Sequence, residues 1–311
     1  MVLKLENTDK VKKKKKINKR TKQLIFYLCL VVLPLVQFCI FYIYVNFSSI
    51  MMAFQEFDAE TNKYVFAGLK NFEQIYLDWV NMPILKVALK NSIILYVVTL
   101  LCMVISTLFS YYIYKKRTFS GLFKIILFLP NIISGLILAL IYMYFTERAV
   151  PEFVSSFGKT ISGLLSDSKT SFVTIIIFNI LMSFGTQTLL ISGAMEGVSD
   201  SITDASQIDG CTPIQEFIHI IVPMIWPTIT TFLVVGVAGV FTNQMSLYAF
   251  YGENAEYANM TIGYYLYRET LFAGVDRYPY LAALGLVLTV IVVPITYIMK
   301  WATNKFGPKT S

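Results

Sequence analysis

The feature that most constrains this chain is a set of six stretches that contain no Asp, Glu, Lys or Arg. Each has at least 22 residues, and together they cover 24–45, 91–114, 125–146, 171–195, 220–241 and 278–299. At a rise of about 1.5 Å per residue, roughly 20 helical residues cross the hydrocarbon core of a bilayer. Each stretch can therefore form a membrane-spanning helix.

Composition supports this interpretation. Hydrophobic residues make up 56% of the chain and charged residues 14%, against about 45–50% and 25% in ordinary soluble domains. We therefore expect an all-α integral membrane protein, with six spans in one domain over 24–300. A basic tail, 1–23, precedes this domain, and a short tail, 301–311, follows it.

Prolines lie inside or at the start of several spans, at Pro34, Pro130, Pro223, Pro227 and Pro294. A membrane helix tolerates such breaks where neighbouring helices or a water-filled cavity satisfy the freed carbonyl groups. Two interpretations stay open: the prolines shape spans that line a pathway, or they are irregularities of packing.

Basic residues predict the orientation. Ten Lys and Arg residues precede the first span, including the run 12–16, and the loop after the second span adds Lys115, Lys116, Arg117 and Lys124. The positive-inside rule places both segments, and the C-terminal tail, in the cytoplasm. The lysine run needs no explanation beyond topology and attraction to anionic lipid headgroups, so we expect no nucleic-acid partner.

The predicted cytoplasmic loop 196–216 breaks this charge rule, because it contains five acids and no Lys or Arg. Its apolar residues recur at helical spacing, at Val198, Ile202, Ala205 and Ile208. Gly210 can end such a helix in the left-handed conformation. Thr212, Pro213 and Gln215 then match a helix start with a capping box. We predict two helices joined at a glycine, the first with an apolar stripe that needs a partner surface.

Residues 204–211 (DASQIDGC), followed by Phe217, Pro223 and Pro227, resemble the EAA signature of ABC importer permeases. That signature reads E-A-A-x-x-D-G-A, with a later phenylalanine and two prolines. This chain departs from it with Asp204 for Glu, Ser206 for Ala and Cys211 for Ala. Aspartate keeps the charge, and serine and cysteine keep the small volume. A helix-turn-helix loop of an unrelated transporter is the alternative.

Three further stretches resemble the branch of that family that includes maltose and glycerol-3-phosphate importers. They are Leu129, Pro130 and Asn131 at the third span, residues 261–267 (TIGYYLY) before the sixth span, and Phe66, Gly68, Leu69, Asn71 and Phe72 after the first span. The resemblance extends over most of the chain from about residue 24. A short amphipathic helix is expected over 69–79, at the membrane interface.

The resemblance implies the permease fold and a mechanism. The loop 196–216 would be a coupling helix that seats in a separate ATPase subunit, and its docking residues would be Asp204, Ala205, Ser206, Asp209 and Gly210. The chain would pair with a second, homologous permease subunit in a bacterial cell membrane. Two ATPase subunits and an extracellular solute-binding protein would complete the importer.

The cargo expected from the resemblance is a sugar or oligosaccharide. Its pathway needs polar and aromatic side chains at membrane depth. The candidates in and after spans three to five are Asn131, Asn179, Ser183, Gln187, Asn243, Gln244 and Tyr248. Each can equally serve as an ordinary hydrogen bond between membrane helices.

No residue pattern indicates catalysis or a bound cofactor. Gly158, Lys159 and Thr160 resemble the end of a P-loop, but Phe153 stands where the motif requires its first glycine. ATP and Mg²⁺ would therefore be used by the partner ATPase and not bound here. The single histidine, His219, and the four cysteines lack metal-ligand spacing. We expect no metal site and no enzyme.

Three alternative functions remain. An ABC permease for a phosphate ester or a peptide would share the coupling loop. A secondary transporter would need ionisable residues buried within its spans, and the six stretches hold no carboxylate or lysine. A membrane enzyme would need a nucleophile, a metal or an acid pair near an interface.

Overall fold

A computed structural model describes residues 19–308 and divides into two compact units, Met1–Met51 and Met52–Ser311. Helix α1 (Lys19–Gln37), the π-helix η1 (Phe38–Tyr44) and α2 (Val45–Met52) form one apolar helix of 34 residues. All of it except Met52 belongs to the first unit. The expected first span, 24–45, lies inside it. The lysine run 12–16 lies outside the described residues.

The second unit begins with a β-hairpin. Strands β1 (Gln55–Asp58) and β2 (Lys63–Phe66) pair antiparallel, with Gln55 opposite Phe66 and Asp58 opposite Lys63. At the tip, the Asp58 carboxylate accepts hydrogen bonds from the Thr61 hydroxyl (2.7 Å) and the Glu60 N–H (3.0 Å). These two bonds lower the pKa of Asp58.

The hairpin is tied to the expected interfacial helix. This helix, α3 (Lys70–Asn81), confirms the helix predicted over 69–79. The Asn71 amide donates to the carbonyls of Ala53 (2.9 Å) and Gln55 (2.7 Å). Gly68 turns the chain into α3 with a positive φ of 61°. Asn71 and Gly68 thus have defined structural roles.

Four of the long apolar helices lie in the second unit. They are α4 (Pro83–Tyr114), α8 (Ser171–Glu196), the run from α10 (Pro213–Glu216) through η3 (Phe217–Ile221) and α11 (Val222–Thr242) to α12 (Leu247–Tyr251), and the run from η5 (Val275–Arg277) into α14 (Tyr278–Phe306). With the N-terminal helix, five helices within residues 19–308 are long and apolar enough to cross a membrane. The helical membrane architecture predicted from the charge-free stretches is confirmed.

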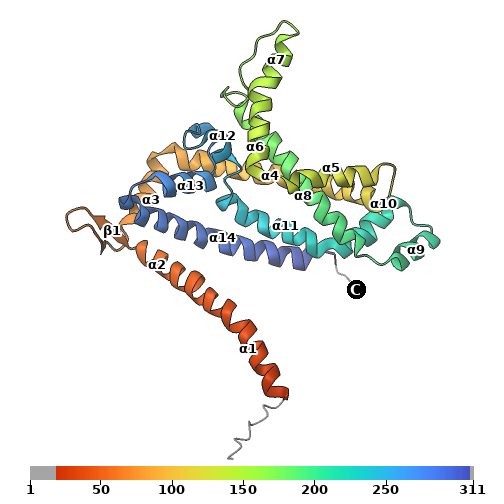
Figure 1. Ribbon diagram of the computed structural model, residues 1–311, viewed down its shortest axis with the longest axis horizontal. Coiled ribbons are helices and arrows are strands. Elements are labelled where there is room, and N and C mark those ends of the chain that lie inside the picture. Colours follow the sequence, from red (N-terminus) through yellow and green to blue (C-terminus); the bar gives the residue numbers. More distant parts are fainter. Residues whose placement is uncertain (1–18, 309–311) are drawn as a thin grey trace, which may run out of the picture. The chain divides into compact units, whose positions relative to one another are not determined.

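The third expected span, 125–146, is not one continuous helix. It divides into α5 (Ser120–Ile132) and α6 (Gly135–Tyr144), and the second arm continues through η2 (Phe145–Ala149) into α7 (Val150–Ser155). The two arms are bent by 101°, and they make a sixth span only if they are taken together. Pro130 lacks the N–H that would bond one turn back, and the chain extends at Ile133 and Ser134. The α6–α7 arm projects away from the other helices of this unit (Figure 1).

The remaining elements cap the two ends of this unit (Figure 1). At the loop end lie α9 (Asp200–Ile208), α10 and the Phe306 end of α14. At the hairpin end lie β1, α3 and α13 (Ile262–Phe272), with η4 (Tyr257–Asn259) in the connection before α13. Helix α14 runs to Phe306, beyond the expected span 278–299, and the Trp226 indole of α11 donates to the Thr303 carbonyl in its last turns (3.1 Å).

Candidate functional site

The loop at the loop end has the predicted form. Helix α9 ends at Ile208, and Gly210 takes a φ of +79°. Thr212 and Gln215 form a complete capping box at the start of α10, with Pro213 in the first turn. The prediction of two helices joined at a glycine is confirmed. The second helix continues directly into η3 and α11.

The five predicted docking residues do not all face the same way. Asp204, Ala205, Asp209 and Gly210 are exposed, whereas Ser206 is 5% exposed and its hydroxyl donates to the Thr203 carbonyl (2.8 Å). Ser206 therefore packs against its own chain. The stripe predicted from apolar spacing splits as well: Val198 is buried, while Ile202 and Ile208 are 39% and 86% exposed.

A polar cavity of about 370 Å³ lies between α8 and the chain that follows α11. Four of the seven predicted pathway residues line it: Asn179, Ser183, Gln187 and Asn243. The rest of the lining is Met182, Thr186, Phe232, Met245 and Ser246. The lining holds amide, hydroxyl, thioether and aromatic groups and no charged side chain.

The amides of the cavity are only partly engaged. Asn179 Nδ2 donates to the Ile175 carbonyl (2.9 Å), and Gln187 Oε1 accepts from the Ser106 hydroxyl (3.3 Å). Asn243 Oδ1 accepts from the Met245 N–H (2.9 Å). Each side chain thus makes a structural hydrogen bond and keeps further donor or acceptor positions open to the cavity. The hydrogen bonds expected between membrane helices are therefore present, and a role of these side chains in a cargo pathway stays a prediction.

Asn131 belongs to an adjoining cavity of about 340 Å³ between α5, α6 and α8. The two cavities share Met182, Thr186 and Ser246. The Thr186 hydroxyl donates to Asn131 Oδ1 (2.9 Å), so it joins the two polar surfaces. Gly185 allows α8 to approach this closely, because a Cβ there would lie 3.0 Å from the Leu127 carbonyl oxygen of α5.

The wall after α11 is a sharp break that α13 supports. Met245 and Ser246 both have positive φ, 52° and 59°. Gly263, in the TIGYYLY stretch, lies against this break: a Cβ there would be 2.5 Å from the carbonyl carbon of Asn243. The glycine of this motif is thus explained by close backbone contact with the cavity wall.

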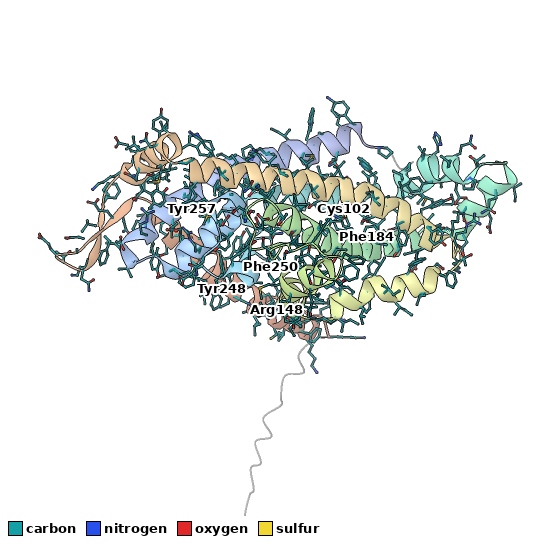
Figure 2. The ribbon with its side chains drawn as sticks, turned by 90° about the horizontal axis from the view of Figure 1, so that it is seen from above. Cys102, Arg148, Phe184, Tyr248, Phe250 and Tyr257 are labelled. Atoms are coloured by element: carbon teal, nitrogen blue, oxygen red, sulfur yellow. The ribbon has the colours of Figure 1, made fainter. Side chains whose placement is uncertain are left out.

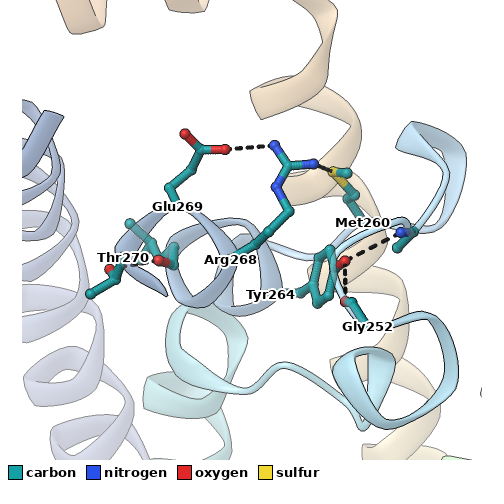
Figure 3. A network of polar contacts seen from close by, with 8 residues as sticks. Gly252, Met260, Tyr264, Arg268, Glu269 and Thr270 are labelled. Atoms are coloured by element: carbon teal, nitrogen blue, oxygen red, sulfur yellow. Dashed lines mark hydrogen bonds and ion pairs between the residues drawn. The ribbon is translucent and has the colours of Figure 1, made fainter. Parts of the chain in front are cut away.

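The first tyrosine of the same motif fixes the preceding loop (Figure 3). The Tyr264 hydroxyl donates to the Gly252 carbonyl (2.8 Å) and accepts from the Ala255 N–H (3.2 Å). Burial raises the pKa of Tyr264 above its ordinary value, so the hydroxyl stays protonated and able to donate. Arg268 on the same helix pairs with Glu269 (2.6 Å).

Gln244 and Tyr248 are not part of either cavity. Gln244 Oε1 is buried without a hydrogen-bond partner among the described residues. The Tyr248 ring packs on Tyr267 and Phe272, with centroid distances of 5.1 and 6.3 Å. Its neighbour Phe250, labelled with it in Figure 2, packs on Phe178 at 5.0 Å. Of the three pathway candidates after the fifth span, only Asn243 lines a cavity, so the prediction is wrong for Gln244 and Tyr248 as lining residues.

Thr186 is the main lining residue that the sequence prediction missed. It lies three residues after Ser183 and seven after Asn179, so helical spacing places all three on one face of α8. That signal was available in the sequence.

The part of the chain that the structure describes contains no group of three or more His, Cys, Asp or Glu residues placed to hold a metal ion. Gly158, Lys159 and Thr160 follow α7 in the projecting arm, away from the loop end. The candidate site therefore consists of two adjoining polar cavities and an exposed acidic loop.

Comparisons with known proteins place this chain in a family. The family model described as "Binding-protein-dependent transport system inner membrane component" matches residues 103–311. The probable ABC transporter permease protein YurN of Bacillus subtilis is 24% identical over 277 residues, which is 86% of this chain and 92% of YurN. The arabinooligosaccharides transport system permease protein AraP of the same organism is 23% identical over 276 residues, covering 86% and 85%.

A solved structure shares the fold. It is a crystal structure of a bacterial ABC transporter involved in the import of the acidic polysaccharide alginate. One of its chains superposes with a TM-score of 0.74 at 20% sequence identity, over 92% of this chain and 97% of that chain. With the family match over two thirds of the sequence, this chain is a multi-pass membrane protein that belongs to the inner membrane components of binding-protein-dependent transport systems.

Proposed function

We propose that this chain is one of two channel-forming subunits of an ATP-driven importer for a sugar or oligosaccharide. An extracellular binding protein delivers the cargo, and a separate ATPase subunit uses ATP and Mg²⁺ to drive its passage. The observation that carries the proposal is the uncharged polar cavity along α8, in a chain whose loop end exposes an acidic helix.

The cavity chemistry favours a neutral hydroxylated cargo. Asn179, Ser183 and Gln187 offer hydrogen-bond donors and acceptors on α8, and Phe232 adds an aromatic face. Sugars bind through this combination of hydrogen bonds and apolar contact. The names of AraP and of the alginate transporter point to saccharides as well.

A phosphate ester is the second candidate cargo, and a peptide the third. Protein sites for phosphate commonly use Arg or Lys, and the two cavity linings contain neither. A saccharide therefore fits these linings better than a phosphate ester does.

We assign ATPase docking to the exposed face of α9 and the following turn: Asp204, Ala205, Asp209 and Gly210. Ser206 packs beneath this face. Ile202 and Ile208 are apolar and exposed beside the acids, as expected for a surface that a partner covers. Since exposed ion pairs each contribute about 0–1 kcal/mol, the apolar contacts would supply most of the affinity.

The proposed orientation puts the loop end in the cytoplasm, together with both termini. Lys115 and Lys116 line the same polar cleft as Asp200 and Thr203 of α9. The segment with the basic residues and the acidic helix thus lie on one side, and the positive-inside rule assigns that side to the cytoplasm. The hairpin end would then meet the binding protein. A related but distinct permease subunit and two ATPases complete the complex.

Transport in reconstituted vesicles tests this function. The full chain would be purified with its co-purifying subunits and binding protein, and uptake of labelled oligosaccharides, glycerol 3-phosphate and a tripeptide would be compared. We expect ATP-dependent uptake of an oligosaccharide and cross-linking of an Ala205→Cys variant to the ATPase subunit. Uptake of only the phosphate ester or the peptide would refute the sugar assignment. ATP-independent uptake, or an α9 that cross-links to no ATPase, would refute the coupled importer.

A further inference from the structure

An ion pair between a buried carboxylate and a partly buried ammonium group joins α10 to the end of α4. Glu216, the last residue of α10, is 2% exposed, and its Oε1 lies 2.5 Å from the Lys115 ammonium group. The side chains of the pair are 3% and 21% exposed. Lys115 directly follows α4 and lies about one hundred residues before its partner in the sequence.

Two further contacts hold the same junction. The Tyr111 hydroxyl donates to the Pro213 carbonyl (3.0 Å), and the Tyr111 ring packs on Phe217 at a centroid distance of 5.0 Å. The Lys115 ammonium also lies 5.8 Å from the centroid of the Tyr111 ring. The end of α4 therefore contacts α10 and the start of η3, the elements that follow α9 and Gly210.

The chemistry of this pair indicates positioning more than stability. Burying the Glu216 carboxylate and most of the Lys115 side chain costs free energy that their attraction only partly returns, and an apolar pair of similar volume is often at least as stable. Buried ion pairs can instead fix one geometry, as they do where register or a switch depends on them. The pair between Lys124 and Glu196 offers a contrast, because its side chains are 41% and 53% exposed.

From this junction, direct contacts lead along α4 to the cavity. The Ser110 hydroxyl donates to the Thr188 carbonyl of α8 (3.0 Å), and the Ser106 hydroxyl donates to Gln187 Oε1 (3.3 Å). Gln187 lines the polar cavity. Through α4, these contacts connect the loop end to the wall of the polar cavity.

We infer that Lys115 and Glu216 are positioning residues that couple movement of α9 to α4, and through α4 to the wall of the cavity. The inference rests on the proposed function, since it requires an ATPase that moves α9. Tyr111 acts with them by holding α10 at the Pro213 carbonyl.

The test replaces both charges at once, with the double variant Lys115→Met/Glu216→Met in the complete reconstituted complex. Neither charge is left alone, so the complex should assemble. The measured quantities are ATP hydrolysis and cargo uptake in the same vesicles. We expect hydrolysis to continue while uptake per ATP falls roughly two- to thirtyfold, the range that mutations along coupling networks produce.

The matched control is Lys124→Met, which breaks the exposed pair at the same end and should leave uptake per ATP unchanged. Lys115→Arg keeps the charge and should retain most of the coupling. If the double variant fails to assemble, the ratio of uptake to hydrolysis is measured instead in Tyr111→Phe, which removes the hydroxyl that bonds to Pro213 and faces Glu216.

An unchanged ratio of uptake to hydrolysis in the double variant, or in Tyr111→Phe where that variant decides, would overturn the inference. If the unaltered complex shows no ATP-dependent uptake, the proposed function fails, and this inference fails with it. The two failures are distinct, because the first requires a working importer.

Discussion

At the scale of single residues, Gly263 shows how one atom sets the position of the cavity wall. A Cβ at this position would lie 2.5 Å from the carbonyl carbon of Asn243, and backbone cannot yield as a flexible side chain can. Gly263→Ala should therefore push α13 away from the break after α11. We expect a loss of about 1–3 kcal/mol in the free energy of unfolding, the usual cost of overpacking. Thermal unfolding of the detergent-solubilised protein measures it.

Gly285→Ala is the control for this prediction. Gly285 lies inside α14, and a Cβ added there would have no neighbouring atom within 4 Å. Alanine there should stabilise the helix by roughly 0.5–1 kcal/mol, because it lowers the conformational entropy of the unfolded chain. Equal melting temperatures for Gly263→Ala and the unaltered protein would contradict the close-contact argument.

Residue-level predictions from sequence succeeded where the cause is local. The capping box of Thr212 and Gln215 and the left-handed Gly210 depend on neighbours within a few positions. The Tyr248 ring instead packs on Tyr267 and Phe272 of α13, about twenty residues further along the chain. Sequence spacing alone contains no information about those contacts.

At the scale of elements, Gly210 decides how α9 meets α10. Its φ of +79° suits glycine, and the space around it is open, so a substitution acts through the backbone and not through a clash. A left-handed residue with a Cβ costs roughly 1–2 kcal/mol, and a β-branched residue resists this conformation most. We expect Gly210→Val to insert normally into the membrane but to lose uptake and stimulation of the ATPase by binding protein.

Gly210→Asn is the matched substitution, because asparagine tolerates the left-handed conformation. It should retain most uptake. If the valine variant transports as well as the asparagine variant, the angle between α9 and α10 does not matter for coupling.

The charge-free stretches predicted where apolar helices lie, but not which of them bend. Pro34, Pro227 and Pro294 all sit inside continuous helices, whereas the segment after Pro130 breaks. The break needs the extended backbone at Ile133 and Ser134. A proline therefore marks only a position where a bend is permitted, and the bend forms here where the backbone after α5 becomes extended.

At the scale of the whole second unit, the sequence predicted a multi-span membrane protein, and the structure adds two adjoining polar cavities. Hydropathy and charge indicate a multi-span membrane protein, and the DASQIDGC stretch indicates a loop that couples to a partner. The two adjoining cavities instead require three separate segments to meet: α8, the break at Met245 and Ser246, and α5 with Asn131. Their meeting depends on glycines at 185 and 263, whose role appears only once the neighbouring backbone is known.

Thr186 joins the two cavities, so it tests whether they form one passage. Thr186→Val keeps the shape of the side chain and removes the hydroxyl that donates to Asn131 Oδ1. If the cargo crosses here, losing one hydrogen bond of about 1 kcal/mol should raise the KM for uptake roughly fivefold. Uptake per ATP should stay unchanged, because α9 and the Lys115–Glu216 pair are untouched.

Thr231→Val is the control, since the Thr231 hydroxyl only donates to the Pro227 carbonyl within α11 (2.9 Å) and lines neither cavity. Its KM should match that of the unaltered complex. A Thr186→Val complex with an unchanged KM would mean that the cargo does not contact this hydroxyl, and the passage would then have to be sought away from the junction of α5 and α8. A raised KM with constant uptake per ATP would separate the two functions of the molecule: α8 contacts the cargo, and the loop end supplies the force.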